Sequence, residues 1–171
     1  MKLKNRFVRS ATWEGMAAED GACTQRITDV MTELAEGQVG LIISSHAYVR
    51  PDGQAGPFQL GIYTDEFIDD YRKMTRAVHE RGSKVVLQIT HAGAFASAKL
   101  IGKPPLAFSS VENFTKAPRR IMENDDLENL VDAFAQGARR AKEAGFDGVQ
   151  IQAAHGYLLS QSLSPALNKR N

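Results

Sequence analysis

Cysteine is almost absent from this sequence of 171 residues. The single residue, Cys23, excludes a disulfide within the chain and any zinc or iron–sulfur site built from several cysteines, and it is typical of a reducing compartment. A surplus of either charge is also lacking, because 21 Lys and Arg residues stand against 20 Asp and Glu residues. This balance disfavours nucleic acid and anionic membranes as partners, since both bind to basic surfaces.

Long apolar runs are missing as well. No stretch approaches the roughly 20 apolar residues that a membrane-spanning helix needs. The basic segment 1–15 has no apolar core of the kind found in signal peptides. We therefore expect no membrane partner and a cytoplasmic location. Glycine-rich turns of the G-x-G-x-x-G type follow none of the predicted strands, which disfavours a Rossmann dinucleotide-binding domain.

Strands and helices are predicted to alternate along the chain. Four short runs rich in apolar and β-branched residues are typical of buried strands. They are 6–12, 39–45, 84–90 and 146–152. Three segments with apolar residues at helical spacing are typical of amphipathic helices. They are 24–37, 64–82, with Phe67, Tyr71, Met74 and Val78 on one face, and 124–145, with Leu127, Leu130, Val131 and Phe134 on one face. This alternation predicts an α/β protein with a parallel sheet and right-handed crossovers.

Local signals place some of the helix ends and one long loop. Thr24 and Thr64 suit the N-cap positions of their helices. The stretch 97–121 holds three of the six prolines and is predicted to be irregular, either functional or disordered.

Every predicted strand ends in polar residues. The four groups are Ser10–Thr12, Ser44–His46, Gln88–His91 and Gln150–Tyr157. In parallel α/β folds the loops at the carboxyl ends of the strands converge on a shared crevice. The functional site is therefore predicted at this end of the sheet.

The corner after the fourth strand offers three chemical groups. Gln152 and His155 lie three residues apart and are both able to donate a hydrogen bond to one oxygen, and Tyr157 offers a phenolic proton. The alternative is structural, with Gln152 and His155 satisfying loop backbone and Tyr157 packed in the core. Gln88 poses the same choice, because an amide at the end of an apolar strand needs either a ligand or a neighbouring side chain as partner.

A metal site is not predicted. His79 and His91 belong to separate elements, and no acidic cluster accompanies them. Cys23 has no basic neighbour in sequence closer than Arg26, so a nucleophilic role is unsupported.

Four ordered motifs resemble the Old Yellow Enzyme family of FMN-dependent ene-reductases. They are "LKNRFVRSATWEGM", "VGLIISSHAYVRPDG", "LQITHAG" and "AGFDGVQIQAAHGYLLSQSLSPALNKRN". The resemblance implies a (β/α) TIM barrel of eight strands that binds FMN at its C-terminal mouth. It also implies transfer of a hydride from NAD(P)H to flavin N5 and then to the alkene of an enone or enoate. Residues 1–171 are expected to form a single domain, the N-terminal half of that barrel with four β/α strands.

The resemblance also implies roles for residues at the first three strand ends. Ala11, Thr12 and Trp13 match positions that line the flavin, and His46 matches a small residue that faces its ring. Gln88 matches a glutamine that binds the pyrimidine edge of the flavin.

At the fourth strand end the implied roles are catalytic. Gln152 and His155 match the pair that holds the substrate carbonyl oxygen, and Tyr157 matches the residue that donates a proton to the α-carbon. The chain departs from the usual pattern here, because the pair reads Gln-x-x-His where the family usually has His-x-x-His or His-x-x-Asn. Ala94 also replaces the arginine of the common His-Ala-Gly-Arg run, so the substrate stays open.

Half a barrel is expected to have two open sheet edges, which favours association. We therefore expect a homo-oligomer that takes a small-molecule enone or enoate as substrate. Two alternatives to ene reduction stay open. One is a truncated half-barrel without flavin binding or turnover, and the other is a different barrel enzyme such as a metal-dependent lyase.

Overall fold

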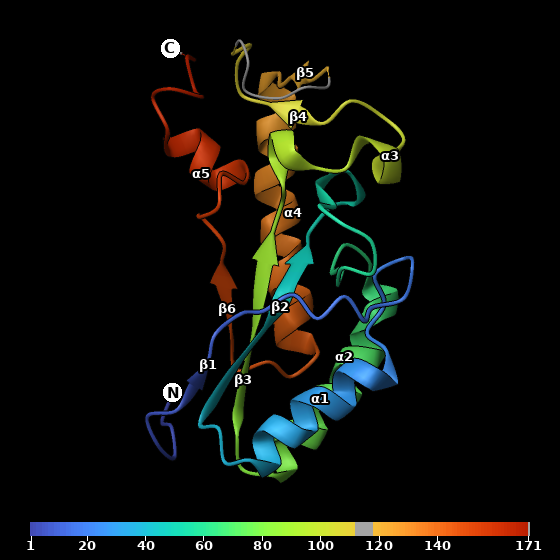
Figure 1. Cartoon of the computed structure of the whole chain (residues 1–171), viewed down its shortest axis with the longest axis vertical. Coiled ribbons are helices and arrows are strands. Elements are labelled where there is room, and N and C mark those ends of the chain that lie inside the picture. The colour runs from blue at the N-terminus through green and yellow to red at the C-terminus, as the bar shows by residue number, and fades with distance from the viewer. Residues whose placement is uncertain (112–117, 171) are drawn as a thin grey trace.

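A parallel sheet of four strands forms the centre of the molecule, as the alternation of strands and helices predicts (Figure 1). The computed structural model describes residues 1–111 and 118–170. The strands lie in the order β1–β2–β3–β6, and each neighbouring pair is parallel. Their bounds are Val8–Arg9 for β1, Leu41–Tyr48 for β2, Lys84–Thr90 for β3 and Gly148–Ile151 for β6.

The third strand has its predicted bounds, whereas the others differ. The prediction for β1 was wrong in length, because the chain leaves the sheet after Arg9. The Arg9 guanidinium donates to the carbonyl oxygen of Ile43 at 2.7 Å and forms an ion pair with Glu14. These contacts hold the residues after β1 in a loop. By contrast, β2 runs three residues further than predicted, to Tyr48, because its last residues pair with β3.

Three amphipathic helices cover one face of the sheet: α1 (Gln25–Glu36), α2 (Ile68–Glu80) and α4 (Asn124–Glu143). In α2 the predicted apolar stripe is confirmed, because Tyr71, Met74 and Val78 are fully buried. In α4 the prediction was wrong for Val131, which is 69% exposed. A periodic pattern identifies an apolar stripe, but it does not identify which part of the stripe a neighbour covers.

The predicted N-caps differ in outcome. Thr64 accepts a hydrogen bond from the Glu66 N–H, although the first turn there is a 3₁₀ helix, η2 (Asp65–Phe67), and not part of α2. Thr24 stands at the N-cap of α1, but its hydroxyl donates to the carbonyl oxygen of Met16 at 2.6 Å and does not cap the helix. Its side chain therefore fastens the preceding loop.

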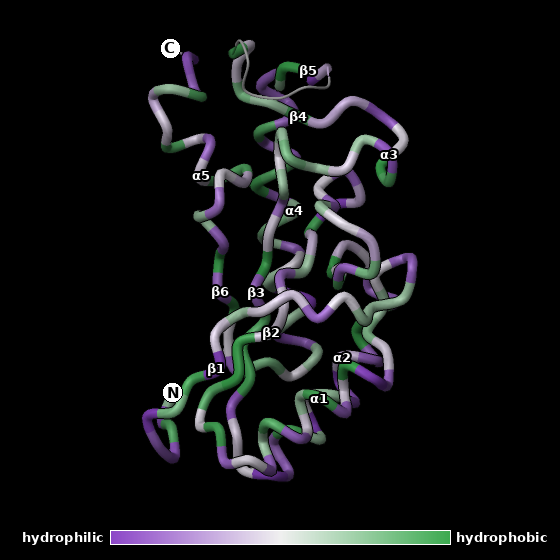
Figure 2. Tube along the Cα trace, viewed as in Figure 1, coloured by the Kyte–Doolittle hydropathy of each residue, from purple (hydrophilic) through white to green (hydrophobic). Residues whose placement is uncertain are grey.

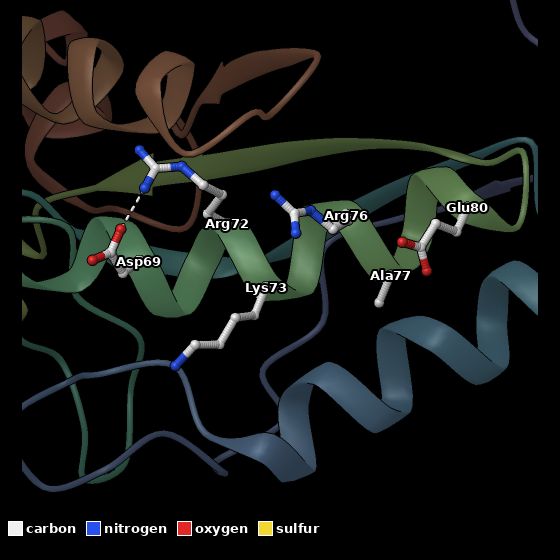
Figure 3. A pocket seen from close by; sticks show the side chains of 6 residues that line it. All are labelled: Asp69, Arg72, Lys73, Arg76, Ala77 and Glu80. Carbon is white, nitrogen blue, oxygen red and sulfur yellow. Dashed lines mark hydrogen bonds and ion pairs between the residues drawn. The ribbon is translucent and has the colours of Figure 1, made fainter.

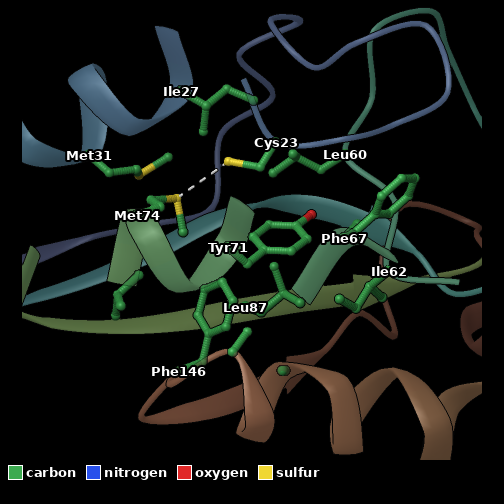
Figure 4. Packing of buried hydrophobic residues seen from close by; sticks show 14 of the residues in the cluster. Cys23, Ile27, Met31, Leu60, Ile62, Phe67, Tyr71, Met74, Leu87 and Phe146 are labelled. Carbon is green, nitrogen blue, oxygen red and sulfur yellow. Dashed lines mark hydrogen bonds between the residues drawn. The ribbon is translucent and has the colours of Figure 1, made fainter. Parts of the chain in front are cut away.

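The main core lies between these helices and the outward-facing side chains of the sheet (Figure 4). Leu87 of β3 packs there with Tyr71, Met74 and Phe146, and the Tyr71 hydroxyl donates to the carbonyl oxygen of Gly61 at 2.9 Å. Hydrophobic residues predominate along much of β2, whereas hydrophobic and hydrophilic residues alternate along α1 and α2 (Figure 2). Burial of this layer fixes which face of each strand is free for chemistry.

Short elements gather at the carboxyl end of the sheet (Figure 1). They are η1 (Pro51–Gly53), η3 (Gly93–Phe95), α3 (Ala98–Ile101), β4 (Leu106–Ala107), β5 (Arg120–Ile121) and α5 (Leu158–Leu163). The prediction that 97–121 is irregular was thus wrong in part, because α3 forms and β4 pairs in parallel with β5. Residues 112–117 of that stretch lie outside the described residues. Within the described ranges, no helix is long and apolar enough to cross a membrane.

Candidate functional site

Side chains from three strands form a row on the inner face of the sheet, the face opposite the helices. His46 of β2 pairs in register with Gln88 of β3, which pairs with Gln150 of β6. A β-bulge makes this possible, because the register between β2 and β3 shifts between Ile43 and His46. The extra residue turns His46 to the same face as Gln88. Without it, His46 would point into the helix layer.

Ser44 satisfies the backbone group that this bulge leaves without a ladder partner. Its hydroxyl oxygen accepts from the Gln88 N–H at 3.2 Å, and its own proton goes to the Ser45 carbonyl oxygen at 2.8 Å. Both serines are buried, at 0% and 1% exposed. Nothing in the sequence alone signalled this bulge, since it depends on pairing with a strand more than 40 residues away.

Gln88 finds its partner in a neighbouring strand. Its Nε2 donates to Oε1 of Gln150 at 2.6 Å. This is the structural alternative that the sequence left open, and it does not remove the amides from use. The pair keeps the carbonyl oxygen of Gln88 and the NH₂ group of Gln150, so an acceptor and a donor remain side by side.

Gln152 and His155 are brought together after β6. Gln152 Nε2 lies 3.1 Å from His155 Nδ1, and the Gln152 side chain is buried whereas His155 is exposed. His155 adopts a left-handed backbone conformation, with φ of 58°. This turn brings its ring back to Gln152 within three residues.

The free end of the Gln152 amide is buried without a partner. Its Oε1 has no hydrogen bond among the described residues. The oxygen and nitrogen of an amide exchange by a half rotation, so the tautomer of His155 decides which of them faces the site. A buried polar atom without a partner costs free energy, so this oxygen has room for a hydrogen-bond partner that the described residues do not supply.

Tyr157 stands beside the row, at the N-cap of α5. The centroid of its ring is 6.0 Å from that of His46, at an interplanar angle of 50°. Burial raises the pKa of the Tyr157 phenol, so it keeps its proton at neutral pH. Burial, with a smaller contribution from His155, lowers the pKa of His46 to about 4. His46 is therefore a neutral imidazole at neutral pH.

The residues after β1 lie in a separate loop. Ala11, Thr12 and Trp13 follow Arg9, whose guanidinium donates to the Thr12 carbonyl oxygen at 3.4 Å. Trp13 is 51% exposed and lies against Gly56, where a Cβ atom would come within 3.2 Å of the indole. Among the described residues, no hydrogen bond or ring contact joins these three residues to the row.

Two buried glutamines that the sequence reading missed hold the site in place. Gln59 donates from Nε2 to the His46 carbonyl oxygen at 3.2 Å and accepts from the Ala55 N–H at 2.8 Å. Gln161 of α5 accepts from the Ala94 N–H at 3.2 Å and donates to the Gly156 carbonyl oxygen at 2.6 Å. Gln59 links β2 to the loop that follows it, and Gln161 links the loops after β3 and β6. A single polar residue forms no sequence pattern that indicates such a role.

The two histidines considered for a metal lie at opposite ends of β3. Nε2 of His79 is 2.7 Å from Asp147, whose carboxylate accepts from the N–H of Val85 at the start of the strand. His91, at the other end, is buried 3.3 Å from Asp52. In the described part of the chain, no three His, Cys, Asp or Glu residues gather in a way that suits a metal ion.

A shallow hollow on the outer side of α2 carries charges but no convergent chemistry (Figure 3). Arg72 pairs with Asp69, and Lys73 pairs with Asp70 at 2.8 Å. Such exposed pairs one turn apart on a helix are typical of a solvated surface.

Comparison with known proteins gives matches along the whole chain. The model of the NADH:flavin oxidoreductase / NADH oxidase family matches residues 1–171. An NADPH dehydrogenase of Bacillus subtilis (strain 168) is 40% identical over 99% of this chain and 50% of its own length. The chain therefore spans about half the length of the curated relatives it matches, except for an NADH oxidase of Thermoanaerobacter brockii, of which it covers 26%.

Solved structures confirm the fold. The Old Yellow Enzyme from Pichia sp. AKU4542 matches 99% of this chain and 47% of its own, with a TM-score of 0.92 and 29% identity. Morphinone reductase matches 98% of this chain and 49% of its own, with a TM-score of 0.88 and 26% identity. The prediction of a parallel barrel-type α/β fold, present here over half the length of such barrels, is confirmed.

Proposed function

Because the chain belongs to the NADH:flavin oxidoreductase / NADH oxidase family, that of Old Yellow Enzyme, we propose that it forms part of an FMN-dependent ene-reductase. The substrate is the alkene of an α,β-unsaturated carbonyl or carboxylate compound, and NAD(P)H is the reductant. The observation that carries this proposal is the cluster at the carboxyl end of the sheet. There Gln152 contacts His155, and Tyr157 follows two residues later in the sequence.

The inner face has groups that fit a flavin. The acceptor of Gln88 and the donor of Gln150 complement the edge of a pyrimidine ring, on which an N–H stands beside a carbonyl group. We propose that Gln88 and His46 bind the cofactor from the sheet, and that Ala11, Thr12 and Trp13 bind it from the loop after β1. When bound, FMN supplies the hydride chemistry, taking a hydride from NAD(P)H and passing it to the alkene β-carbon.

Gln152 and His155 hold the substrate oxygen in this mechanism. Each donates an N–H to it, which draws electron density from the alkene and stabilises the negative charge that develops on the oxygen. The contact between the two side chains fixes their relative orientation before the substrate arrives. An amide does not become cationic, so His155 is the only member of this pair that can carry a positive charge.

Tyr157 supplies the proton for the α-carbon. Its raised pKa keeps the phenol protonated until the substrate is in place. The hydroxyl of Tyr157 belongs to a ring already packed beside His46, so its position is limited by a neighbour from another strand.

The role of Tyr157 can be tested by measuring the two half-reactions separately, namely flavin reduction by NAD(P)H and flavin reoxidation by the enone. In the flavin-loaded protein, Tyr157→Phe is expected to slow enone-dependent reoxidation by about 100-fold or more, since a general acid contributes about 10²–10⁴. Flavin reduction by NAD(P)H should change by less than about twofold. Stopped-flow absorbance of the flavin measures both rates.

A matched control is Tyr63→Phe, since that hydroxyl donates to the Asp20 carbonyl oxygen at 3.0 Å, away from the row. Equal losses in both half-reactions for Tyr157→Phe would contradict the proton-donor role. A purified chain that stays colourless after FMN is added would favour the alternative, a half-barrel without flavin binding.

We also propose that the chain associates with copies of itself. β1 and β6 are edge strands, and they carry exposed Val8 (50%) and Ile151 (56%). Ile151 and the exposed Val131 also line an apolar groove of about 370 Å³ beside α5. Such surfaces favour association. A monomeric mass by light scattering at micromolar concentration would contradict this.

A cytoplasmic location is proposed from the lone, buried cysteine.

A further inference from the structure

The proposed mechanism gives His46 a contact with the cofactor but no role toward the substrate. His46 matches a position at which the family resemblance implies a small residue, and the bulge at Ser44 and Ser45 directs it into the site. Its backbone is fixed as well, because Gln59 donates to its carbonyl oxygen. The imidazole thus has a defined place in the row, next to the phenol of Tyr157.

Among the described residues, the side chains placed around His46 on this face are amides, an imidazole and a phenol. Gln88 and Gln150 lie along the row, and Gln152 and His155 follow β6. None of these four is a carboxylate. On the other side of β2, the charged residue of β1 is Arg9, and Glu14 neutralises it. Among the described residues, the titratable groups that face His46 are therefore His155 and Tyr157, and neither supplies a negative charge at neutral pH.

Such a site suits a ligand that brings its own negative charge. A ketone oxygen is satisfied by two donors, which Gln152 and His155 already provide. A carboxylate has two oxygens and about four acceptor positions, so it needs further donors. His46 and Tyr157 are the further donors on the same face. An anion beside the imidazole also favours its cationic form, and the resulting charge-assisted hydrogen bond is stronger than a neutral one.

We propose that His46 is a specificity-determining residue that makes this site prefer α,β-unsaturated carboxylates to uncharged α,β-unsaturated carbonyl compounds. The inference rests on the proposed function and narrows its substrate class. It assigns His46 a role on the substrate side of the site, in addition to any contact with the cofactor. At a pH between the His46 titration midpoints of the free and the bound chain, binding of the carboxylate is accompanied by uptake of a proton, which His46 holds.

Ligand titrations of the purified 171-residue chain, followed by NMR of its labelled histidines, test this directly. The probes are trans-2-hexenoate and the uncharged trans-2-hexenamide, which has the same carbon skeleton. The four histidines are assigned by single substitution. With saturating hexenoate, the pH at the midpoint of the His46 titration should rise by about 1–3 units, as expected for an opposite charge in contact. Hexenamide should leave it unchanged.

The matched variant is His46→Asn, which keeps a hydrogen-bond donor but cannot become cationic. The native chain should bind hexenoate at least about tenfold more tightly than hexenamide at pH 6, a preference within the range for charge-assisted hydrogen bonds. His46→Asn should lose that preference and still bind hexenamide. A His79→Asn variant, altered at the opposite end of β3, should keep it.

Three results would overturn the inference: no binding of hexenoate, equal binding of both probes, or an unchanged preference in His46→Asn. Failure of the proposed function has a different signature. In that case the flavin-loaded protein reduces neither the acid nor the amide, whatever the chain binds in the NMR titration.

Discussion

Replacing Ser44 with alanine tests how the sheet turns His46 toward the site. In the folded protein the Ser44 hydroxyl is the partner of the Gln88 N–H, at 3.2 Å, in a fully buried position. Alanine removes the hydroxyl without filling its place, so the N–H of Gln88 loses its partner. A buried donor left in this state costs about 1–3 kcal/mol. The expected loss in the free energy of unfolding is of that size.

Urea denaturation followed by circular dichroism measures the loss, and Ser45→Ala is the matched control. Ser45 is equally buried, at 1% exposed, but among the described residues its hydroxyl makes no hydrogen bond. Its replacement should cost less than about 1 kcal/mol. Hydrogen exchange of the Gln88 amide gives a local measure and should accelerate only in Ser44→Ala. If the two variants differ by less than about 0.5 kcal/mol, the bulge does not depend on this hydroxyl.

Two further predictions concern η1, the 3₁₀ helix that follows β2. Gly53→Ala should destabilise the chain by about 1–3 kcal/mol, because the added Cβ would come within 2.6 Å of the buried His91 ring. Its melting temperature should be lower than that of the control Gly37→Ala, where the atom nearest to the added Cβ is 3.4 Å away. Equal melting temperatures would refute the clash. Burial alone would raise the pKa of Asp52, but hydrogen bonds from His91 and Arg50 hold it well below the usual 3.8. The stability given by ionised Asp52 is therefore complete above about pH 4 and is lost as the pH falls below that value. Asp52→Asn should flatten the pH dependence of the unfolding free energy between about pH 4 and pH 2, and an unchanged slope there would contradict this.

Most of the fold was predictable because burial leaves a local pattern in the sequence. The range 84–90 matched β3 to the residue, since its apolar residues are flanked by polar ones on both sides. The stripe with Tyr71 and Met74 was correct for the same reason. Val131 belongs to an equally regular stripe and is nevertheless exposed, because exposure depends on what packs against the helix and not on the helix itself.

Some features of the candidate site were likewise predictable from the sequence, and others were not. The proximity of Gln152 and His155 was predictable, since three residues separate them, and the structure brings them within 3.1 Å. The partnership of Gln88 with Gln150 spans 62 positions, so only the choice between a ligand and a neighbour was visible in the sequence. The orientation of His46 depended on a bulge whose presence requires two strands to meet. The catalytic and cofactor roles of these residues stay predictions.

The thiol of Cys23 has a practical consequence for measuring the protein. It is 7% exposed, its Sγ lies 3.9 Å from Sδ of Met74, and burial raises its pKa to about 12. The thiolate is the reactive form, so an alkylating reagent attacks Cys23 only in molecules whose core has opened. The thiol of Cys23 is therefore a natural probe of how often the hydrophobic core opens. The rate at which the reagent modifies this thiol reports how often the segment that holds Cys23 separates from α2, without any label being engineered into the protein.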